Sequence, residues 1–201
     1  MASIDIDGFA VPLCVAGDPA LEVCNTRAGW RAPTPKEYLH SHAHLCVWVG
    51  HAGLLTPDEV AAARRAGARH PAASEAVLRR AIALREALYD VLTGEGEQTA
   101  AWGALDAEAR RAAAVAHLAP GRPATWRLTG ASDVELPLLQ VAWHAARLVT
   151  SATADAVRAC PGDGCGWLFA DPRGRRRWCS MAWCGNREKV RAHAARQRAP
   201  R

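Results

Sequence analysis

The stretch 160-CPGDGCGWLFADPRGRRRWCSMAWCGNR-187 is the most informative for the fold, and it holds four of the chain's seven cysteines. The four form two matched pairs, Cys160-x4-Cys165 and Cys179-x4-Cys184, separated by thirteen residues. Two thiol pairs of this kind are the ligand set that a tetrahedral Zn²⁺ ion takes. The spacing therefore predicts one structural zinc held by these four residues. Because four thiolates leave no open position for water, the metal is expected to stabilise the fold and not to catalyse.

Two other roles for the paired cysteines stay open at this point. An iron–sulfur cluster also takes four thiolates, although its usual cysteine spacings are closer. Two local disulfides are the other alternative, but an odd total of cysteines argues against a disulfide framework. The remaining cysteines show no pairing pattern and are expected to be small buried hydrophobic residues; they are Cys14, Cys24 and Cys46.

The sequence around the paired cysteines predicts a treble-clef-like zinc finger, made of a β-hairpin and a helix. Residues 161–164 favour a sharp turn inside the first pair. Residues 167–170 and 175–178 flank a Pro- and Gly-containing turn, which is typical of a β-hairpin. A helix is expected over residues 186–198, with Cys184 at its beginning. So small a module needs its metal to fold.

The preceding residues are predicted to form a mainly helical domain with one short β element. Helical apolar spacing covers residues 74–94 and, more weakly, 105–118, while 136–150 is the most apolar helix and is placed at the centre of the core. Capping boxes at 34–37 and 56–59 predict helices over 34 to about 50 and 56–67. A strand is expected at 124–128. We call residues 1–153 the body and residues 154–201 the finger.

Both parts resemble known families. The cysteine-containing stretch resembles the CGNR zinc finger, which is named for the four residues found here at 184–187. The body is similar to the ABATE domain that usually precedes this finger, through LEVCNTR at 21–27, GLLT at 53–56 and LREAL at 84–88. The family is regarded as bacterial transcription regulators, often linked to stress. The resemblance covers nearly the whole chain and implies DNA binding.

Charge is concentrated in the finger. Residues 158–201 carry eleven Lys and Arg against three Asp and Glu, whereas the rest of the chain carries fourteen against seventeen. This asymmetry indicates an anionic partner for the finger, and a basic helix face can neutralise phosphates or enter a major groove. The residues predicted to contact DNA are Arg173, Arg175, Arg176, Arg177, Asn186, Arg187, Lys189, Arg191 and Arg198.

Some of these residues have a second interpretation. Asn186 either caps the terminal helix or reaches a base edge. Arg187 either contacts DNA or bonds carbonyl groups next to the metal loops. Three tryptophans of the finger are expected to form a small core around the zinc and not a platform for bases; they are Trp167, Trp178 and Trp183.

Two clusters in the body were weighed as ligand sites. Asn25, Thr26 and Arg27, together with Arg85, are predicted to line a pocket for a small anionic ligand, unless they form only a turn. His40, His44 and His51 share one face of the expected helix but spread over about 16 Å, so one ion could take His40 and His44 but not all three. They are expected to be surface or core histidines. No nucleophile triad, phosphate loop or catalytic carboxylate pair is evident, so an enzyme is not expected.

Two hypotheses follow. The first is a DNA-binding regulator whose body senses a small-molecule effector or forms a homodimer. The alternative is a small-molecule-binding or enzymatic body with the finger as a structural or protein-docking appendage. The first residues lack the pattern of a signal peptide and no stretch is long and apolar enough to span a membrane, so a cytoplasmic protein without a membrane partner is expected.

Overall fold

The computed structural model describes residues 3–198, and the side chain of Arg198 lies outside what it describes. The body is a helical bundle built around α6 (Leu136–Val149). This helix contacts the five other body helices, which are α1 (Pro19–Cys24), α2 (His42–His51), α3 (Pro57–Arg69), α4 (Pro71–Thr93) and α5 (Gln98–Ala114). Leu138, Val141 and Ala145 of α6 are fully buried. The predicted central position of this helix is therefore confirmed.

Helix ends follow local chemistry where the sequence signals are strongest. The capping box before α3 is formed: the Thr56 hydroxyl accepts from the Glu59 N–H at 3.3 Å, and the Glu59 carboxylate accepts from the Thr56 N–H at 2.8 Å. α4 ends at Gly94, whose φ of 72° is the left-handed conformation that glycine tolerates best. Both helices were predicted from these residues.

The helix predicted from Thr34 is wrong in its first turns. Lys36–Glu37 form β4, which pairs with β3 (Arg27–Ala28), and α2 begins only at His42, capped by the Ser41 hydroxyl. The Glu37 carboxylate does not close a capping box, because it accepts a hydrogen bond from Arg85 of α4 at 2.7 Å. A long-range ion pair has overridden the local signal.

The described residues also form four two-stranded antiparallel hairpins. β1 (Ser3–Ile6) pairs with β2 (Phe9–Pro12), and β5 (Ala116–Ala119) pairs with β6 (Thr125–Leu128). The strand predicted at 124–128 is therefore confirmed, while the helix predicted to reach residue 118 ends at Ala114. In the finger, β7 (Val157–Ala159) pairs with β8 (Leu168–Ala170).

The predicted hairpin of the finger is wrong in its pairing. β8 pairs with the preceding β7, so the first cysteine pair lies in the hairpin loop, and residues 175–178 form no strand. Instead, the Asp171 carboxylate accepts from the N–H groups of Arg175 and Arg176 at 2.9 and 3.1 Å and folds this segment into a loop. We call residues 171–178 the arginine loop.

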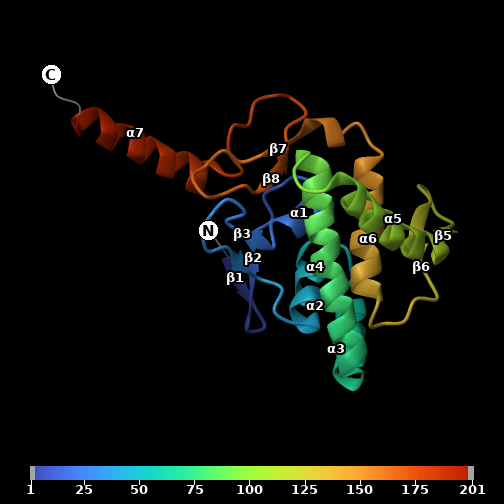
Figure 1. Cartoon of the computed structure of the whole chain (residues 1–201). Coiled ribbons are helices and arrows are strands. Elements are labelled where there is room, and N and C mark those ends of the chain that lie inside the picture. The colour runs from blue at the N-terminus through green and yellow to red at the C-terminus, as the bar shows by residue number, and fades with distance from the viewer. Residues whose placement is uncertain (1–2, 199–201) are drawn as a thin grey trace.

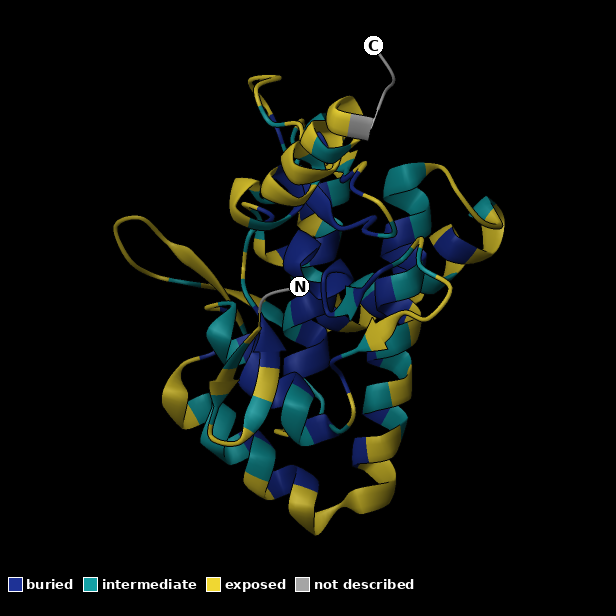
Figure 2. Cartoon of the chain, turned by 90° about the vertical axis from the view of Figure 1, so that its left-hand side faces the viewer, coloured by how far each residue is buried: buried dark blue, intermediate teal, exposed yellow. Residues whose placement is uncertain are grey.

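The finger ends in a helix that projects from the rest of the molecule (Figure 1). A short helical turn, η1 (Ala154–Ala156), follows α6, and a π-helical turn, η2 (Met181–Gly185), leads into α7 (Asn186–Arg198). Most of α7 is exposed, whereas buried residues gather between the body helices (Figure 2). The predicted fold class, mainly helical with a small finger of hairpin and helix, is confirmed. Within the described residues, no helix combines the length and apolar character needed to cross a bilayer.

Candidate metal centre and basic surface

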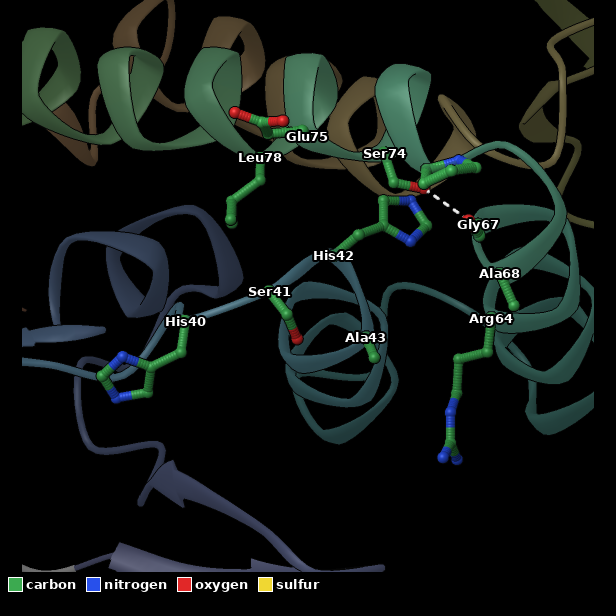
Figure 3. A pocket seen from close by; sticks show the side chains of 11 residues that line it. His40, Ser41, His42, Ala43, Arg64, Gly67, Ala68, Ser74, Glu75 and Leu78 are labelled. Atoms are coloured by element: carbon green, nitrogen blue, oxygen red, sulfur yellow. Dashed lines mark hydrogen bonds between the residues drawn. The ribbon is translucent and has the colours of Figure 1, made fainter.

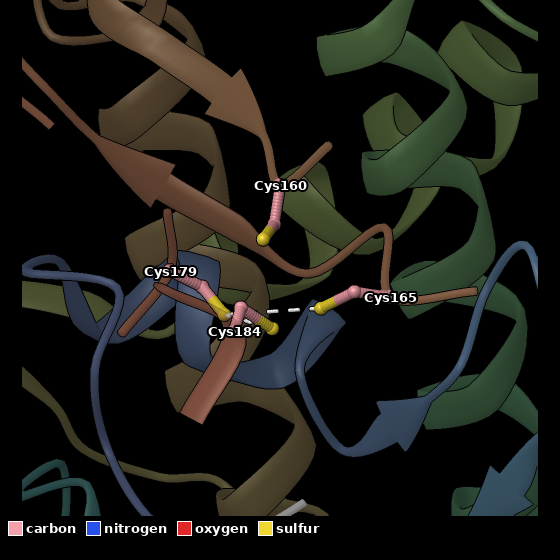
Figure 4. Close-up of side chains that lie close together, drawn as sticks. All are labelled: Cys160, Cys165, Cys179 and Cys184. Atoms are coloured by element: carbon pink, nitrogen blue, oxygen red, sulfur yellow. Dashed lines mark hydrogen bonds between the residues drawn. The ribbon is translucent and has the colours of Figure 1, made fainter. Parts of the chain in front are cut away.

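The four paired cysteines converge on one point (Figure 4). All four are buried, and their sulfur atoms lie within 4.8 Å of one another. The Sγ of Cys179 is 3.8 Å from that of Cys165 and 3.6 Å from that of Cys184. Zinc–thiolate bonds of about 2.3 Å in a tetrahedron place sulfur atoms about 3.8 Å apart. The donor set therefore fits one structural Zn²⁺, as predicted from the spacing.

The turn between Cys160 and Cys165 depends on glycine. Gly164 and Gly166 have φ of 66° and 69°, which side chains rarely adopt. At Gly162, a Cβ atom would lie 3.1 Å from the Sγ of Cys184 and would press on the metal ligand. The Pro- and Gly-rich composition of this turn is thus explained by the close approach of the second cysteine pair.

Protonation of the four thiols is mutually dependent. Hydrogen bonds from Cys165 and its neighbours lower the pKa of Cys160, whereas donation to Cys160 raises the pKa of Cys165 and Cys179. Four thiolates so close together repel one another, and a divalent cation between them removes that conflict. The electrostatics therefore agree with the geometry.

The hydrophobic core of the finger includes residues of the body. Trp167 and Phe169 are buried against the cysteines, and Ala28 and Tyr38 of the β3–β4 region complete this cluster. The predicted core role of Trp167 is confirmed, and Trp178 packs against the same cluster from its edge. The finger is therefore packed onto the body.

Hydrogen bonds also join the finger to the body, and we call this contact between the two parts the junction. The main-chain N–H of Trp30 donates to the Cys165 carbonyl, and the Tyr89 hydroxyl donates to the Gly166 carbonyl, both at 3.0 Å. The indole N–H of Trp167 donates to the Arg27 carbonyl, also at 3.0 Å. Trp30 stacks on Tyr89 with ring centroids 3.7 Å apart. These contacts fix the first metal-binding turn against α4.

The four residues predicted to bind a small anion lie at or near the junction. Arg85 is 1 % exposed, and its guanidinium donates to Glu37 at 2.7 Å and to the Thr26 hydroxyl at 3.3 Å. Arg27 pairs with Glu86 at 3.2 Å. Asn25 is fully buried and is bonded to β8. An anion would have to compete with these contacts, and its binding here stays a prediction.

The pKa of Glu37 shows the effect of its contact with Arg85. Burial raises the pKa of this carboxyl, but the hydrogen bond and positive charge of Arg85, together with the N–H groups of Leu39 and Tyr38, outweigh burial and bring the pKa below its usual value. Glu37 was missed as the partner of Arg85, because the sequence around it matches a capping box.

Three of the basic residues predicted to contact DNA are engaged in contacts within the protein. Arg176 donates to the carbonyls of Val15 and Cys179 at 2.8 and 2.6 Å. Arg187 donates to the Asp163 carbonyl at 3.0 Å and contacts the Sγ of Cys184 at 3.7 Å. Arg191 pairs with the Asp163 carboxylate at 2.7 Å. The structural interpretation of Arg187 matches these contacts.

Other basic residues are open to solvent. The arginine loop exposes Arg173, Arg175 and Arg177, and none of them forms an ion pair with the described residues. On α7, Lys189 and Arg196 are exposed together with His193 at spacings of four and three residues, which puts them on one face. We call these three residues the outer face of α7. Arg196 was not among the residues predicted to contact DNA.

Asn186 does not cap α7. It already has helical dihedral angles (φ −65°, ψ −43°), and its side-chain amide donates to the Ala182 carbonyl at 3.3 Å. The helical path instead begins in the turn η2, which also carries Cys184. Among the residues predicted to contact DNA, the side chain of Arg198 is outside the described part.

Fold and site together define a class of protein: a helical domain followed by a basic finger built on a four-cysteine zinc site. Residues 156–197 match the model of the CGNR zinc finger, and residues 17–152 match the model of the ABATE domain, described as "Putative stress-induced transcription regulator". The chain belongs to the ABATE family and carries a CGNR zinc finger. No curated protein matches it.

Proposed function

We propose that the protein is a transcription regulator that binds DNA through the outer face of α7 and the arginine loop, and that it is not an enzyme. The observation that carries this proposal is the projection of α7, a basic helix, away from the body (Figure 1). The family description as a transcription regulator supports it.

The dimensions of α7 suit a groove of duplex DNA. Its thirteen residues give a length of about 20 Å at the usual rise, and a major groove admits one helix. Arg187 and Arg191 hold the inner face of α7 to the first metal-binding turn through Asp163. This leaves Lys189, His193 and Arg196 facing away from that turn. The zinc site would then position the helix without touching DNA itself.

The arginine loop supplies a second set of cations. Its backbone is held by Asp171 while Arg173, Arg175 and Arg177 remain exposed. Guanidinium groups match phosphate geometry with two parallel hydrogen bonds. We therefore assign the loop to phosphate contacts and α7 to the groove.

The test is fluorescence anisotropy of a labelled random-sequence duplex, titrated at several salt concentrations. We expect the logarithm of affinity to fall linearly with the logarithm of salt, by about 0.9 per phosphate contact. R173A/R175A/R177A and K189A/R196A should each weaken binding at least tenfold. R65A/R69A is the matched control, because α3 lies at the opposite end of the molecule from α7 (Figure 1). No binding, or binding insensitive to salt, would reject the proposal.

A second function has one observation in its favour. Arg176, Arg187 and Arg191 serve the fold of the finger, as expected of a structural or protein-docking appendage. This alternative is separated from the first by the same titration, since it predicts no DNA affinity. In either case we place the protein in the cytoplasm, where its seven cysteines, none of which forms a disulfide, would stay reduced.

A further inference from the structure

A cavity of about 400 Å³ opens at the end of the body away from the zinc site (Figure 3). It lies between the beginning of α2, the second half of α3 and the first turns of α4. This volume is in the range of sites that hold small molecules. None of its lining residues belongs to the metal centre or to the basic surface, so it is separate from both.

The walls of the cavity are mostly apolar. Leu78 and Pro71 come from α4, and Ala43 and Ala68 come from α2 and α3. Alanine side chains on two neighbouring helices leave space that larger residues would fill. The cavity therefore offers an apolar surface that a hydrocarbon or aromatic group can cover.

A fixed histidine forms part of the lining. The Nε2 atom of His42 is 2.8 Å from the Val134 carbonyl and carries the proton in that bond, which leaves Nδ1 as an acceptor. The Sγ of Cys46 lies 3.5 Å from Nδ1, and burial raises the pKa of this thiol to about 12, so the thiol donates. His42 is therefore held from two sides, by the Val134 carbonyl and the Cys46 thiol.

Gly67 shows how tightly this wall is built. A Cβ atom at this position would lie 2.5 Å from the His42 Nδ1 and 3.0 Å from the Ser74 hydroxyl. The Ser74 hydroxyl donates to the Gly67 carbonyl at 2.9 Å, as drawn in Figure 3. The α2, α3 and α4 segments are thus in close contact at this wall of the cavity.

One cation borders the cavity. Arg64 pairs through Nη1 with Asp7 at 3.1 Å, and that carboxylate is 68 % exposed. Within the described part of the chain, the guanidinium has no other hydrogen-bond acceptor, and it lies 5.1 Å from the Phe9 ring. A weak, solvent-exposed ion pair of this kind is worth little. Arg64 can therefore exchange Asp7 for the carboxylate of a ligand at small cost.

The opposite border is acidic. Figure 3 shows Glu75 and Leu78 on one side of the cavity and Arg64 on the other. Glu75 pairs with Arg79 at 2.7 Å and is largely exposed. A second negative charge on a ligand would be repelled here, so the arrangement selects one carboxylate joined to an apolar group.

We propose that this cavity binds small monocarboxylic acids with an apolar tail, such as aromatic or medium-chain acids. The carboxylate pairs with Arg64, with two parallel hydrogen bonds, and the tail lies against the neighbouring Ala43 and Ala68. This inference goes beyond the proposed DNA binding and gives the body a ligand. It does not depend on whether the finger binds DNA.

Isothermal titration calorimetry of the full chain tests the proposal with benzoate and hexanoate as probes. We expect saturable binding of at least one acid, and at least tenfold weaker binding of the corresponding amides, benzamide and hexanamide. Succinate should bind at least tenfold more weakly than the monoacids. Equal affinity for acid and amide, or no saturable binding of either acid, would overturn the proposal.

Two pairs of variants locate the site. R64L should weaken benzoate or hexanoate binding at least tenfold, while R65L, on the next residue of α3 and outside this cavity, should leave it unchanged. A68F should fill the cavity and abolish binding, and A107F on the exposed side of α5 is its control. Circular dichroism verifies that each variant folds. Unchanged binding by either folded R64L or folded A68F contradicts the assignment.

The result is distinguishable from that of the DNA titration. If the protein binds the acids but not DNA, the proposed DNA-binding function is rejected and the cavity assignment stands. If it binds DNA but neither acid, the cavity assignment is rejected and the DNA-binding proposal stands.

Discussion

The side-chain amide of Asn25 is bonded to both main-chain groups of Leu168. Its Nδ2 donates to the Leu168 carbonyl at 3.0 Å, and its Oδ1 accepts from the Leu168 N–H at 2.9 Å. Asn25 thus acts as a strand neighbour for β8, across 143 residues of sequence. Asn25 and Leu168 are both fully buried, so water cannot replace the amide. The body and the finger are joined at this point by an exact donor–acceptor match.

Replacing Asn25 should therefore destabilise the whole protein. Asn25→Ala leaves a buried N–H and a buried carbonyl without partners, at about 1–3 kcal/mol each. We expect a loss of about 2–4 kcal/mol in the free energy of unfolding, measured by urea denaturation. Asn186→Ala is the control, because Asn186 is exposed and should cost less than about 0.5 kcal/mol. Equal effects of the two variants would contradict the role of Asn25.

Loss of zinc should weaken the body as well as the finger. The finger core contains Ala28 and Tyr38, and the junction ties the first metal-binding turn to α4. We expect Cys179→Ser, or a strong chelator, to lower the thermal midpoint of the helical signal at 222 nm by at least about 5 °C, since binding free energy is folding free energy. Cys14→Ser, at an exposed cysteine outside the site, should leave the midpoint unchanged. A body that melts at the same temperature without zinc would show that residues 1–153 fold independently.

The zinc site could be predicted from the sequence because its information is local. Four cysteines at regular spacing, with glycines between the first two, specify ligands and turn together. The two capping boxes show where local information ends. Thr56 and Glu59 form theirs, whereas Glu37 is bound by Arg85, which lies 48 residues away. No short-range sequence pattern predicts the contact between Glu37 and Arg85.

The basic residues show the same limit. The sequence places Arg187 and Arg191 on one helix face, which is correct, and a basic face suggests DNA. Only the fold shows that Asp163 occupies this face, and that Lys189 and Arg196 lie on the outer one. Likewise, β8 pairs with β7, to which it is connected by the first cysteine turn. The sequence pattern within 167–178 does not contain β7 and therefore could not predict this pairing.

Arg187 is expected to retain the metal. Arg187→Ala removes the bond to the Asp163 carbonyl in the first metal-binding turn and the contact with the Sγ of the zinc ligand Cys184. A charge-assisted bond of this kind contributes about 1.5–3 kcal/mol. We expect zinc to pass to a colorimetric chelator at least tenfold faster than from the parent protein. Lys189→Ala, two residues along the same helix but on the outer face, should release zinc at the parent rate. If both variants release zinc equally fast, Arg187 has no special role at the site.

Glu37 should give stability that depends on pH. Its pKa is lower in the folded protein than in the unfolded chain, because the attraction of Arg85 outweighs burial. A carboxyl group of this kind stabilises the fold above its unfolded pKa of about 4.3, and the contribution is lost as pH falls through the folded value. Glu37→Gln should therefore destabilise the protein at pH 7, and the difference from the parent protein should shrink as the pH falls below about 4.

The size of the effect follows from the position of the pair. Breaking a buried ion pair costs about 3–5 kcal/mol, and because the Glu37 side chain is 32 % exposed we expect about 2 kcal/mol at neutral pH. Urea denaturation between about pH 2.5 and pH 7 measures it, because the contribution is lost only below the unfolded pKa of about 4.3. Glu95→Gln, which breaks the exposed pair with Arg31, should change stability by less than about 0.5 kcal/mol at every pH. A Glu37→Gln penalty that stays constant across this range would mean that the carboxylate acts through shape and not through its charge on Arg85.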